Sequence, residues 1–295
     1  MAPSPRVGLF KGLGSLLEFL PERVDVAIAT SLAGLAGRVV AGPRANLRNN
    51  LRHALSGGGA VPDDAELERF VDRAFSSYGR YWAESGKLPA ISTDEMARRF
   101  DICEGLEHLR DAERAGKGTI IALPHVGSWE WGGSFLAHIG LPMTAVAEAL
   151  EPPELFEWFQ AKRRAIGIDI EPLDENAGTV LLTTLRNNGV VGLLCDRDIQ
   201  DNGIDVTFFG ERVTMPAGPA TLALRTGATL VGAACYAGPG RGHYAVITPP
   251  IDTTRTGRLR ADVQRCTQLV ARELEGLIQR APEQWHVLQP LFNES

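Results

Sequence analysis

The chain contains 295 residues, of which 44% are hydrophobic and 22% are charged, and its 30 basic side chains stand against 36 acidic ones. This balance is typical of a globular protein with a sizeable core, and it excludes a disordered, collagen-like or coiled-coil chain. The formal net charge of −6 also argues against a general nucleic-acid-binding protein, because neutralising phosphates requires clustered positive charge.

The first 53 residues are basic, although the chain as a whole is acidic. They carry seven Lys and Arg residues against three Asp and Glu residues. A basic, apolar segment on an acidic body indicates a surface for an anionic partner, and a membrane is the simplest such partner. We therefore expect an anionic membrane surface among the partners of this protein, and no nucleic acid.

Residues 7–20 form the first predicted element, an amphipathic helix. Its apolar face either packs on the protein's own core or docks on a membrane, and the basic surplus favours docking slightly. No stretch reaches the roughly 18–20 uninterrupted apolar residues of a spanning helix, and no signal-peptide cleavage pattern is present. The apolar residues at helical spacing are Leu9, Phe10, Leu13, Leu16, Leu17 and Leu20.

Two further helices are predicted at residues 44–55 and 63–82, where apolar side chains recur every three or four positions. Together with the first helix they predict a helical N-terminal subdomain of residues 1–90, with a possible membrane-docking helix. Residues 91–295 are predicted to form an α/β core.

The core alternates short apolar runs with helical segments, which predicts an α/β fold: a mainly parallel central sheet with helices on both faces. In such sheets, ligands bind beyond the carboxyl ends of the strands. The predicted strands are residues 119–123, 144–147, 168–170, 190–195, 229–235 and 244–248. The predicted helices are residues 128–138, 154–166, 179–187, 217–225 and 259–280.

The most informative motif follows the predicted strand 119–123, where His125 stands at the point at which the strand ends. Ser128 is a natural N-cap for the next helix, and Glu130 falls in the first turn of that helix. A turn this short predicts that Glu130 accepts a hydrogen bond from one ring nitrogen of His125 and so fixes the tautomer of the ring. His125 and Glu130 are therefore the predicted catalytic residues.

Other charged side chains follow the neighbouring strands or lie on a helix between them. Their recurrence at one sheet edge, rather than any one of them alone, indicates a substrate-binding site. Arg163 and Arg164 are candidates for an anion or phosphate contact, although a solvated basic face is the more ordinary explanation for one of the two. The predicted substrate-binding residues are Glu148, Arg163, Arg164, Asp196, Arg197 and Asp198.

Several other chemistries lack a motif in this sequence. Ser128 is not in a GxSxG elbow, and no GxGxxG or Walker A sequence is present. The four cysteines are far apart, so neither a zinc site nor a disulfide framework is indicated, and no metal is expected. Cys195 precedes acidic residues, which disfavour a thiolate. A histidine–carboxylate pair without a protein nucleophile remains, and it suits direct deprotonation of a substrate hydroxyl.

The motifs occur in an order that resembles the lipid A biosynthesis acyltransferase family over residues 100–290. The resemblance rests on Pro-His-x-Gly-x-Trp-Glu, which contains the H-x4-D/E spacing of His125 and Glu130, then Cys-Asp-Arg-Asp, Phe-Phe-Gly and Pro-Ala-Gly-Pro-Ala. Glu130 stands where the family often has Asp. Within the family, the sequence is most similar to the actinobacterial branch that acylates phosphatidylinositol mannosides.

This resemblance implies an enzyme that moves a long acyl chain from acyl-CoA, a co-substrate and not a cofactor, to a mannose hydroxyl of a phosphatidylinositol mannoside. It implies a peripheral location on the cytoplasmic face of the cell membrane. His125 would be the general base for direct attack on the thioester, with Glu130 orienting it. Transfer to another glycolipid or to a lysophospholipid, hydrolysis of an acyl-thioester, and a non-catalytic lipid carrier remain alternatives.

Overall fold

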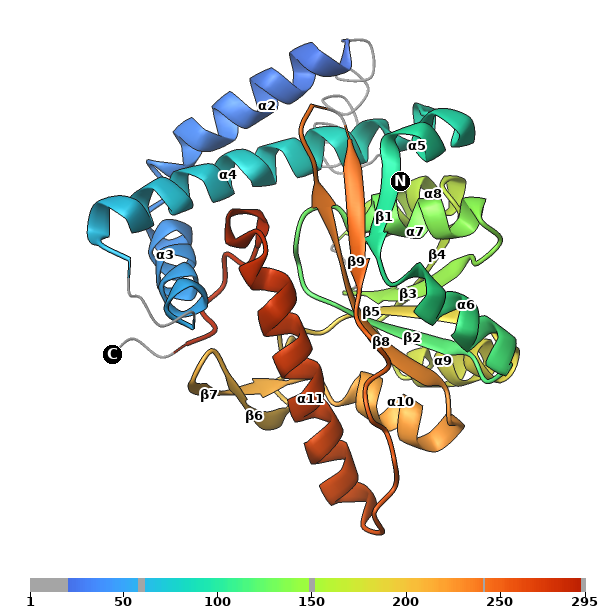
Figure 1. The fold of residues 1–295 in the computed structure, drawn as a ribbon. Helices are drawn as coiled ribbons and strands as arrows, with labels where there is room; N and C mark the ends of the chain where they lie inside the picture. Colours follow the sequence, from blue (N-terminus) through green and yellow to red (C-terminus); the bar gives the residue numbers. More distant parts are fainter. Residues whose placement is uncertain (1–20, 58–61, 149–151, 241, 293–295) are drawn as a thin grey trace.

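The computed structural model describes residues 21–57, 62–148, 152–240 and 242–292. The helix predicted at residues 7–20 lies outside these residues. The described part is an α/β fold around a seven-stranded sheet of order β1-β9-β8-β2-β5-β3-β4. All neighbouring strands in this sheet are parallel except β8 and β9, which are antiparallel. The predicted fold class is therefore confirmed (Figure 1).

The strands are short, and every predicted strand is found. They are β1 (Phe100–Glu104), β2 (Thr119–Leu123), β3 (Met143–Ala147), β4 (Ile168–Pro172), β5 (Val190–Leu194), β8 (Thr229–Ala237) and β9 (His243–Ile247). A separate antiparallel hairpin is formed by β6 (Ile204–Phe208) and β7 (Glu211–Met215). The sequence analysis did not predict β1 or this hairpin.

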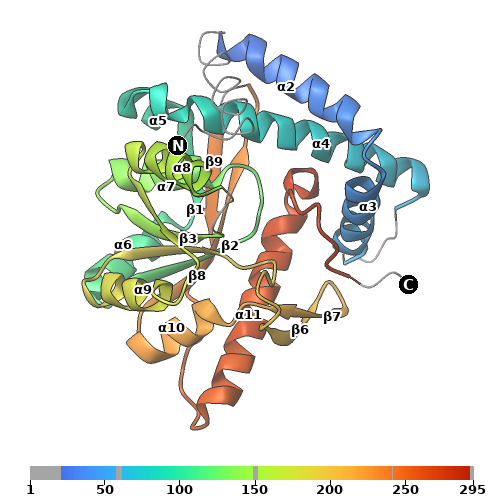
Figure 2. The ribbon, with the colours of Figure 1, turned by 180° about the vertical axis from the view of Figure 1, so that it is seen from behind.

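Within the described residues, the long helices before the sheet are α2 (Glu22–Gly37), α3 (Ala41–Ser56) and α4 (Asp64–Lys87). In Figures 1 and 2, α2 lies alongside α4, and α4 crosses one end of the sheet. Leu51 of α3 and Val71 of α4 share one buried core with Leu274 and Trp285 near the C-terminus. The helical region is therefore joined to the α/β core by a continuous hydrophobic interior.

Helices cover both faces of the sheet, and alternate β2 side chains enter different core clusters. Ile120 packs on the side of α9 (Ala177–Arg186), α10 (Gly218–Thr226) and α11 (Leu259–Gln279). Ile121 packs on the side of α6 (Leu106–Ala115) and α7 (Trp129–His138). Strand β2 is therefore central, and the residues that follow it emerge between the two layers. The remaining helices are α5 (Thr93–Arg99), α8 (Pro153–Ala165) and the 3₁₀ turns η1 (Leu88–Ala90) and η2 (Pro282–Gln284).

Among the described helices, none is by itself long and apolar enough to cross a membrane. Only α2 and α3 taken together pass by length and composition, and they are bent by 95° at the break between them.

Candidate active site

The loop of residues 124–128 carries His125 from the end of β2 to the start of α7. Gly127 has a φ of +57°, and a Cβ atom there would lie 2.1 Å from the Cys235 carbonyl oxygen, so the position requires glycine. The Ser128 N–H donates to this carbonyl over 2.9 Å, and the Gly127 N–H donates to the Gln284 carbonyl over 2.9 Å. The loop is thus fixed between β8 and the C-terminal segment.

The His125 side chain pairs with Asp196, which follows β5 at the same edge of the sheet. Its Nδ1 lies 2.5 Å from Asp196 Oδ1, and its backbone N–H donates to Asp196 Oδ2 over 2.8 Å. Strands β2 and β5 are parallel neighbours, so their carboxyl ends bring these residues together across 71 positions of sequence.

Asp196 is fully buried and remains ionised. Burial alone would raise the pKa of its carboxyl, but the charge of His125, the hydrogen bonds from His125 and the Trp285 indole N–H outweigh burial and lower that pKa. An ionised carboxylate only accepts hydrogen bonds, so the proton in the His125–Asp196 contact is on Nδ1. The other ring nitrogen of His125, Nε2, is left to accept a proton.

A cavity of about 780 Å³ opens beside His125, whose side chain is 25% exposed. It is bounded by the ends of β2, β3 and β5 and by α4, α8, α9 and α10. Within the part of the chain that the structure describes, His125 Nε2 has no protein partner. A group bound in this cavity therefore has access to the free nitrogen of the His125–Asp196 pair.

Glu130 does not contact His125, and the prediction of a direct hydrogen bond between them was wrong. The Tyr81 hydroxyl donates to Glu130 Oε1 over 2.9 Å, and Arg163 Nη2 donates to the same oxygen over 3.2 Å. The first turn of α7 directs Glu130 toward α4 and α8 instead of back toward the loop. Ser128 stands at the N-cap position as predicted, but its side chain makes no capping bond.

The structure separates the two arginines that the sequence analysis paired. Arg163 lines the cavity, where its guanidinium lies over the Trp129 ring at 5.0 Å and pairs with Glu130. Burial opposes its charge, but Glu130 and Tyr81 raise its pKa, so it stays cationic. Arg164 instead pairs with Asp169 on the surface and does not line the cavity. Its predicted place in the site is therefore corrected.

Glu148, Arg197 and Asp198 line the cavity as the strand-end argument predicts. The two carboxylate oxygens of Asp198 accept the Asn202 and Gly203 N–H groups, so part of its role is to shape the loop after β5. Together with Arg163, these residues place charges of both signs around a cavity whose lining is mostly apolar.

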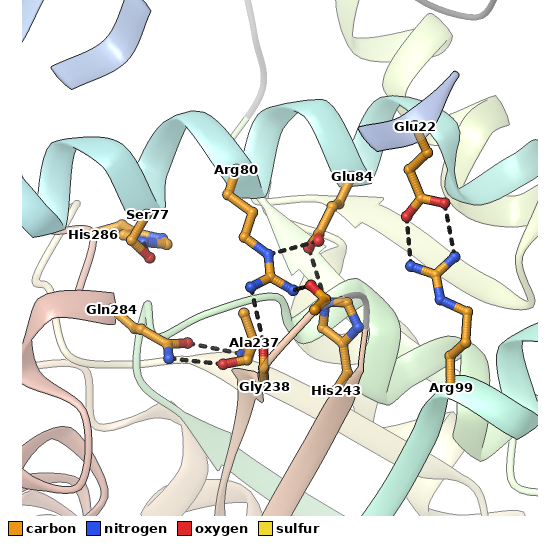
Figure 3. A network of polar contacts seen from close by, with 11 residues as sticks. Glu22, Ser77, Arg80, Glu84, Arg99, Ala237, Gly238, His243, Gln284 and His286 are labelled. Atoms are coloured by element: carbon orange, nitrogen blue, oxygen red, sulfur yellow. Dashed lines mark hydrogen bonds and ion pairs between the residues drawn. The ribbon is translucent and has the colours of Figure 1, made fainter. Parts of the chain in front are cut away.

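Sequence reasoning missed the contribution of α4 and of the C-terminal segment. The backbone N–H of His286 donates to the His125 carbonyl over 2.8 Å, and its Nε2 lies 2.9 Å from Ser77 Oγ (Figure 3). Burial and the charge of His125 lower the pKa of His286 to about 3. Tyr81 on α4 lines the cavity. Only a long-range pairing signal could have placed these residues near His125, because nothing in the local sequence does.

The arrangement suits the transfer of a proton from a bound group to His125. Among the described residues, no side chain near His125 is activated as a covalent nucleophile. The His125 ring bonds to no Ser, Thr or Cys there. Burial and the charge of Asp196 raise the pKa of the Cys195 thiol, so it is not a thiolate. No group of three or more His, Cys, Asp or Glu residues among the described positions is arranged to hold a metal ion.

An α/β sheet with a histidine–aspartate pair at its carboxyl edge, beside a large and mostly apolar cavity, indicates an enzyme whose site has room for a large, partly apolar substrate. Residues 5–294 match the model of the bacterial lipid A biosynthesis acyltransferase family. The chain belongs to this family and is an acyltransferase.

The names of similar proteins agree with this family. The chain is 39% identical over 248 residues to a "phosphatidylinositol mannoside acyltransferase" of Mycobacterium tuberculosis, covering 83% of this chain and 75% of that one. It is 35% identical over 282 residues to the protein of the same name from Mycolicibacterium smegmatis, covering 93% and 87%. It is 23% identical over 273 residues to a "lipid A biosynthesis acyltransferase" of Haemophilus influenzae, covering 92% and 82%.

Proposed function

We propose that the protein transfers a long-chain fatty acyl group from acyl-CoA to a mannose hydroxyl of a phosphatidylinositol mannoside. The His125–Asp196 pair with its free Nε2 at the cavity is the observation that carries this proposal. The names of the mycobacterial relatives support the glycolipid acceptor.

In the proposed reaction, His125 Nε2 takes the proton of the acceptor hydroxyl while the hydroxyl oxygen attacks the thioester carbonyl carbon. A tetrahedral intermediate forms and collapses as the carbon–sulfur bond breaks, and the CoA thiolate leaves with the proton that His125 carried. Asp196 stabilises the imidazolium between these steps. General base catalysis of this kind contributes about 10²–10⁴-fold, and proximity of the two substrates supplies much of the rest.

The charged side chains of the cavity take supporting roles. Arg163 provides positive charge near the reacting atoms or a substrate phosphate, and Glu130 holds its guanidinium in place. Glu148 and Asp198 offer acceptors for sugar hydroxyls, and Arg197 offers a donor for a phosphate or hydroxyl. The reaction requires no cofactor besides acyl-CoA as co-substrate.

The acyl chain is proposed to follow the apolar side of the cavity. A second, smaller cavity of about 40 Å³ lies under α7 and is lined almost entirely by apolar side chains. Leu123 and Trp129 line both cavities, so the smaller one adjoins the larger close to His125. A hydrocarbon chain entering between these two residues would leave its carboxyl end beside the base.

Helix α2 supports a peripheral membrane location, proposed to be the cytoplasmic face where acyl-CoA is available. The apolar residues of α2 at spacings of three and four positions remain exposed: Val24, Ile28, Leu32 and Leu35. Val39, two residues after the end of the helix, is exposed as well. Leu32 and Leu35 are each 61% exposed and Val39 is 77% exposed. An exposed apolar stripe of this kind suits burial in the headgroup region of a bilayer.

Two of the basic side chains in the basic N-terminal segment are paired within the protein. Arg44 and Arg48 of α3 pair with Glu68 of α4, and Arg44 also pairs with Asp72. We therefore propose that apolar contact by α2 contributes more to membrane binding than attraction to anionic lipid.

The test of the activity incubates purified protein with palmitoyl-CoA and a panel of glycolipids and lysophospholipids, with products identified by mass. We expect acylated phosphatidylinositol mannoside from the wild type and none from His125→Ala. His138→Ala, an exposed histidine on α7, is the matched control and should retain full activity. Acylation of a different acceptor, or release of free fatty acid regardless of acceptor, would contradict the proposal.

The test of membrane docking measures sedimentation with phospholipid vesicles. Leu32→Glu with Leu35→Glu should weaken binding strongly at both low and high salt. The control is Thr30→Glu, a charge placed on a less exposed side of the same helix. Unchanged binding by the double variant would show that α2 does not contact the membrane.

A further inference from the structure

The C-terminal segment of residues 284–286 passes directly beside the loop that carries His125. Val126 and Trp285 form an isolated antiparallel bridge. The Gly127 N–H donates to the Gln284 carbonyl, and the His286 N–H donates to the His125 carbonyl. These contacts join residues about 160 positions apart and attach the C-terminal segment to the loop that carries His125.

Side chains of the same segment anchor it to two other elements. The Gln284 amide bonds to both the N–H and the carbonyl of Ala237 at the end of β8, and the His286 ring bonds to Ser77 of α4 (Figure 3). The segment is therefore fixed independently of the His125 loop, so it can serve as a rigid support for that loop.

Trp285 makes the contact that matters most for the chemistry. It is fully buried, and its indole N–H donates to Asp196 Oδ2 over 2.8 Å. The same oxygen accepts the His125 backbone N–H, also over 2.8 Å, while Oδ1 faces His125 Nδ1. With both donors on Oδ2, the carboxylate is held so that only Oδ1 is presented to the imidazole.

We propose that Trp285 is a positioning residue for the acyl transfer, which orients Asp196 through its indole N–H and thereby holds His125 in the reactive tautomer and orientation. This proposal rests on the proposed function of the His125–Asp196 pair. Trp285 does not line the cavity, so it acts on the rate of the chemical step and not on substrate binding.

Trp131 provides a matched comparison within the same chain. Both indoles are fully buried, but the Trp131 N–H has no hydrogen-bond partner in the described structure, and Trp131 lies outside the cavity lining. Replacing either indole by phenylalanine removes a similar volume from the core. Only Trp285→Phe also removes a hydrogen bond to the catalytic carboxylate.

The kinetic test measures kcat and KM for Trp285→Phe and Trp131→Phe in the wild type and in Asp196→Ala. Trp285→Phe should lower kcat by roughly 10- to 100-fold with KM nearly unchanged, as expected for a lost hydrogen bond to a charged group. In Asp196→Ala it should lower kcat by less than about 2-fold, because the bond is already absent. An equal loss in both backgrounds would assign Trp285 to packing alone and overturn the proposal.

A second variant separates the N–H from the volume of the ring. The benzothienyl analogue of tryptophan at position 285 keeps the bicyclic shape and replaces the N–H by sulfur. It should reproduce the kinetic loss of Trp285→Phe without the loss of thermal stability. Wild-type kcat from this analogue would overturn the proposal even if Trp285→Phe did not fold.

Imidazole ¹⁵N spectra provide a readout that needs no turnover. In the wild type His125 should show the single tautomer protonated at Nδ1, and the analogue at 285 should mix the two tautomers. A wild type that has this tautomer but no transferase activity would refute the proposed function while leaving the positioning by Trp285 intact. An unchanged tautomer in the analogue would refute the positioning.

Discussion

The described residues include two histidine–carboxylate pairs, His125–Asp196 and His243–Glu84, and of these two only His125–Asp196 lies at the cavity. His125 and Asp196 meet over 2.5 Å at the cavity, and the ring remains 25% exposed. His243 on β9 and Glu84 on α4 meet over 2.8 Å, but both side chains are almost completely buried (Figure 3). The same pair of functional groups therefore has two different surroundings.

The difference lies in what surrounds the second ring nitrogen. The His243 ring stacks on Trp131 with centroids 4.0 Å apart, and its Nδ1 is buried without a partner in the described structure. Arg80 also bonds to Glu84, so this network joins α4 to strand β9. Burial lowers the pKa of His243, more strongly than Glu84 raises it. Of these two pairs, His125–Asp196 is therefore the one whose second ring nitrogen a substrate in the cavity can reach.

The largest contrast is expected from removing each histidine. His125→Ala should lower acyl transfer by about 10⁴-fold, the upper end for a general base, with little change in stability because the ring is partly exposed. His243→Ala should lower the free energy of unfolding by about 2–3 kcal/mol, because the buried Glu84 carboxylate loses one hydrogen-bond partner, while the folded fraction keeps its activity. Kinetics with palmitoyl-CoA and urea titrations measure both effects. If folded His243→Ala lost its activity, the assignment of His243 to stability and His125 to catalysis would be contradicted.

The two carboxylates should differ in the same way. Asp196→Asn should lower kcat by about 10²–10³-fold, because the amide no longer stabilises the imidazolium or selects the Nδ1–H tautomer. Glu84→Gln should instead reduce thermal stability and leave kcat within about 2-fold of the wild type in the folded protein. Steady-state kinetics and thermal melts of both variants check this, and near-normal kcat in Asp196→Asn would contradict it.

Glu130 is expected to have a smaller effect than Asp196, because it acts through Arg163. Glu130→Gln keeps the hydrogen-bonding shape but removes the charge that pairs with the guanidinium, so we expect a loss in kcat/KM of about 10-fold. The comparison with Asp196→Asn is the control. A larger loss of kcat/KM in Glu130→Gln than in Asp196→Asn would instead support Glu130 as the acid that orients His125, as the sequence spacing predicts.

The smallest effect concerns pH. His286 has a folded-state pKa of about 3. The unfolded chain, with an ordinary histidine pKa near 6.5, therefore binds more protons between these values. Stability should fall by about 1.4 kcal/mol per unit as the pH drops from 6.5 through this window. The urea midpoint should differ less between pH 8 and pH 5 in His286→Gln than in the wild type. An equal difference in the two proteins would contradict this assignment.

The sheet was predictable where strands are buried on both faces. The apolar runs of β2 and β5 identify them directly. In contrast, β1 is an edge strand that carries Asp101 and Glu104, and the β6–β7 hairpin alternates polar and apolar residues on a separate sheet. Charged edges and short polar hairpins lack the hydrophobic signal on which the sequence analysis depended.

The site was only partly predictable for a different reason. The position of His125 follows from local sequence, because a strand end is visible there. The identity of its partner does not follow from local sequence. The spacing favoured Glu130, five positions away, whereas the parallel strands β2 and β5 place Asp196 beside the ring. Trp285 approaches through tertiary packing alone. Local patterns place the base, and only the fold determines which acid orients it.

The central claim is direct transfer by His125 without an acyl-enzyme, and one single-turnover measurement tests it. Wild-type protein is mixed with palmitoyl-CoA, glycolipid acceptor is added, and intact protein mass and lipid products are followed together. We expect acylated glycolipid with no mass increase on the protein, and no product from His125→Ala. An acyl adduct on the protein that forms before acceptor is added and disappears afterwards would contradict it.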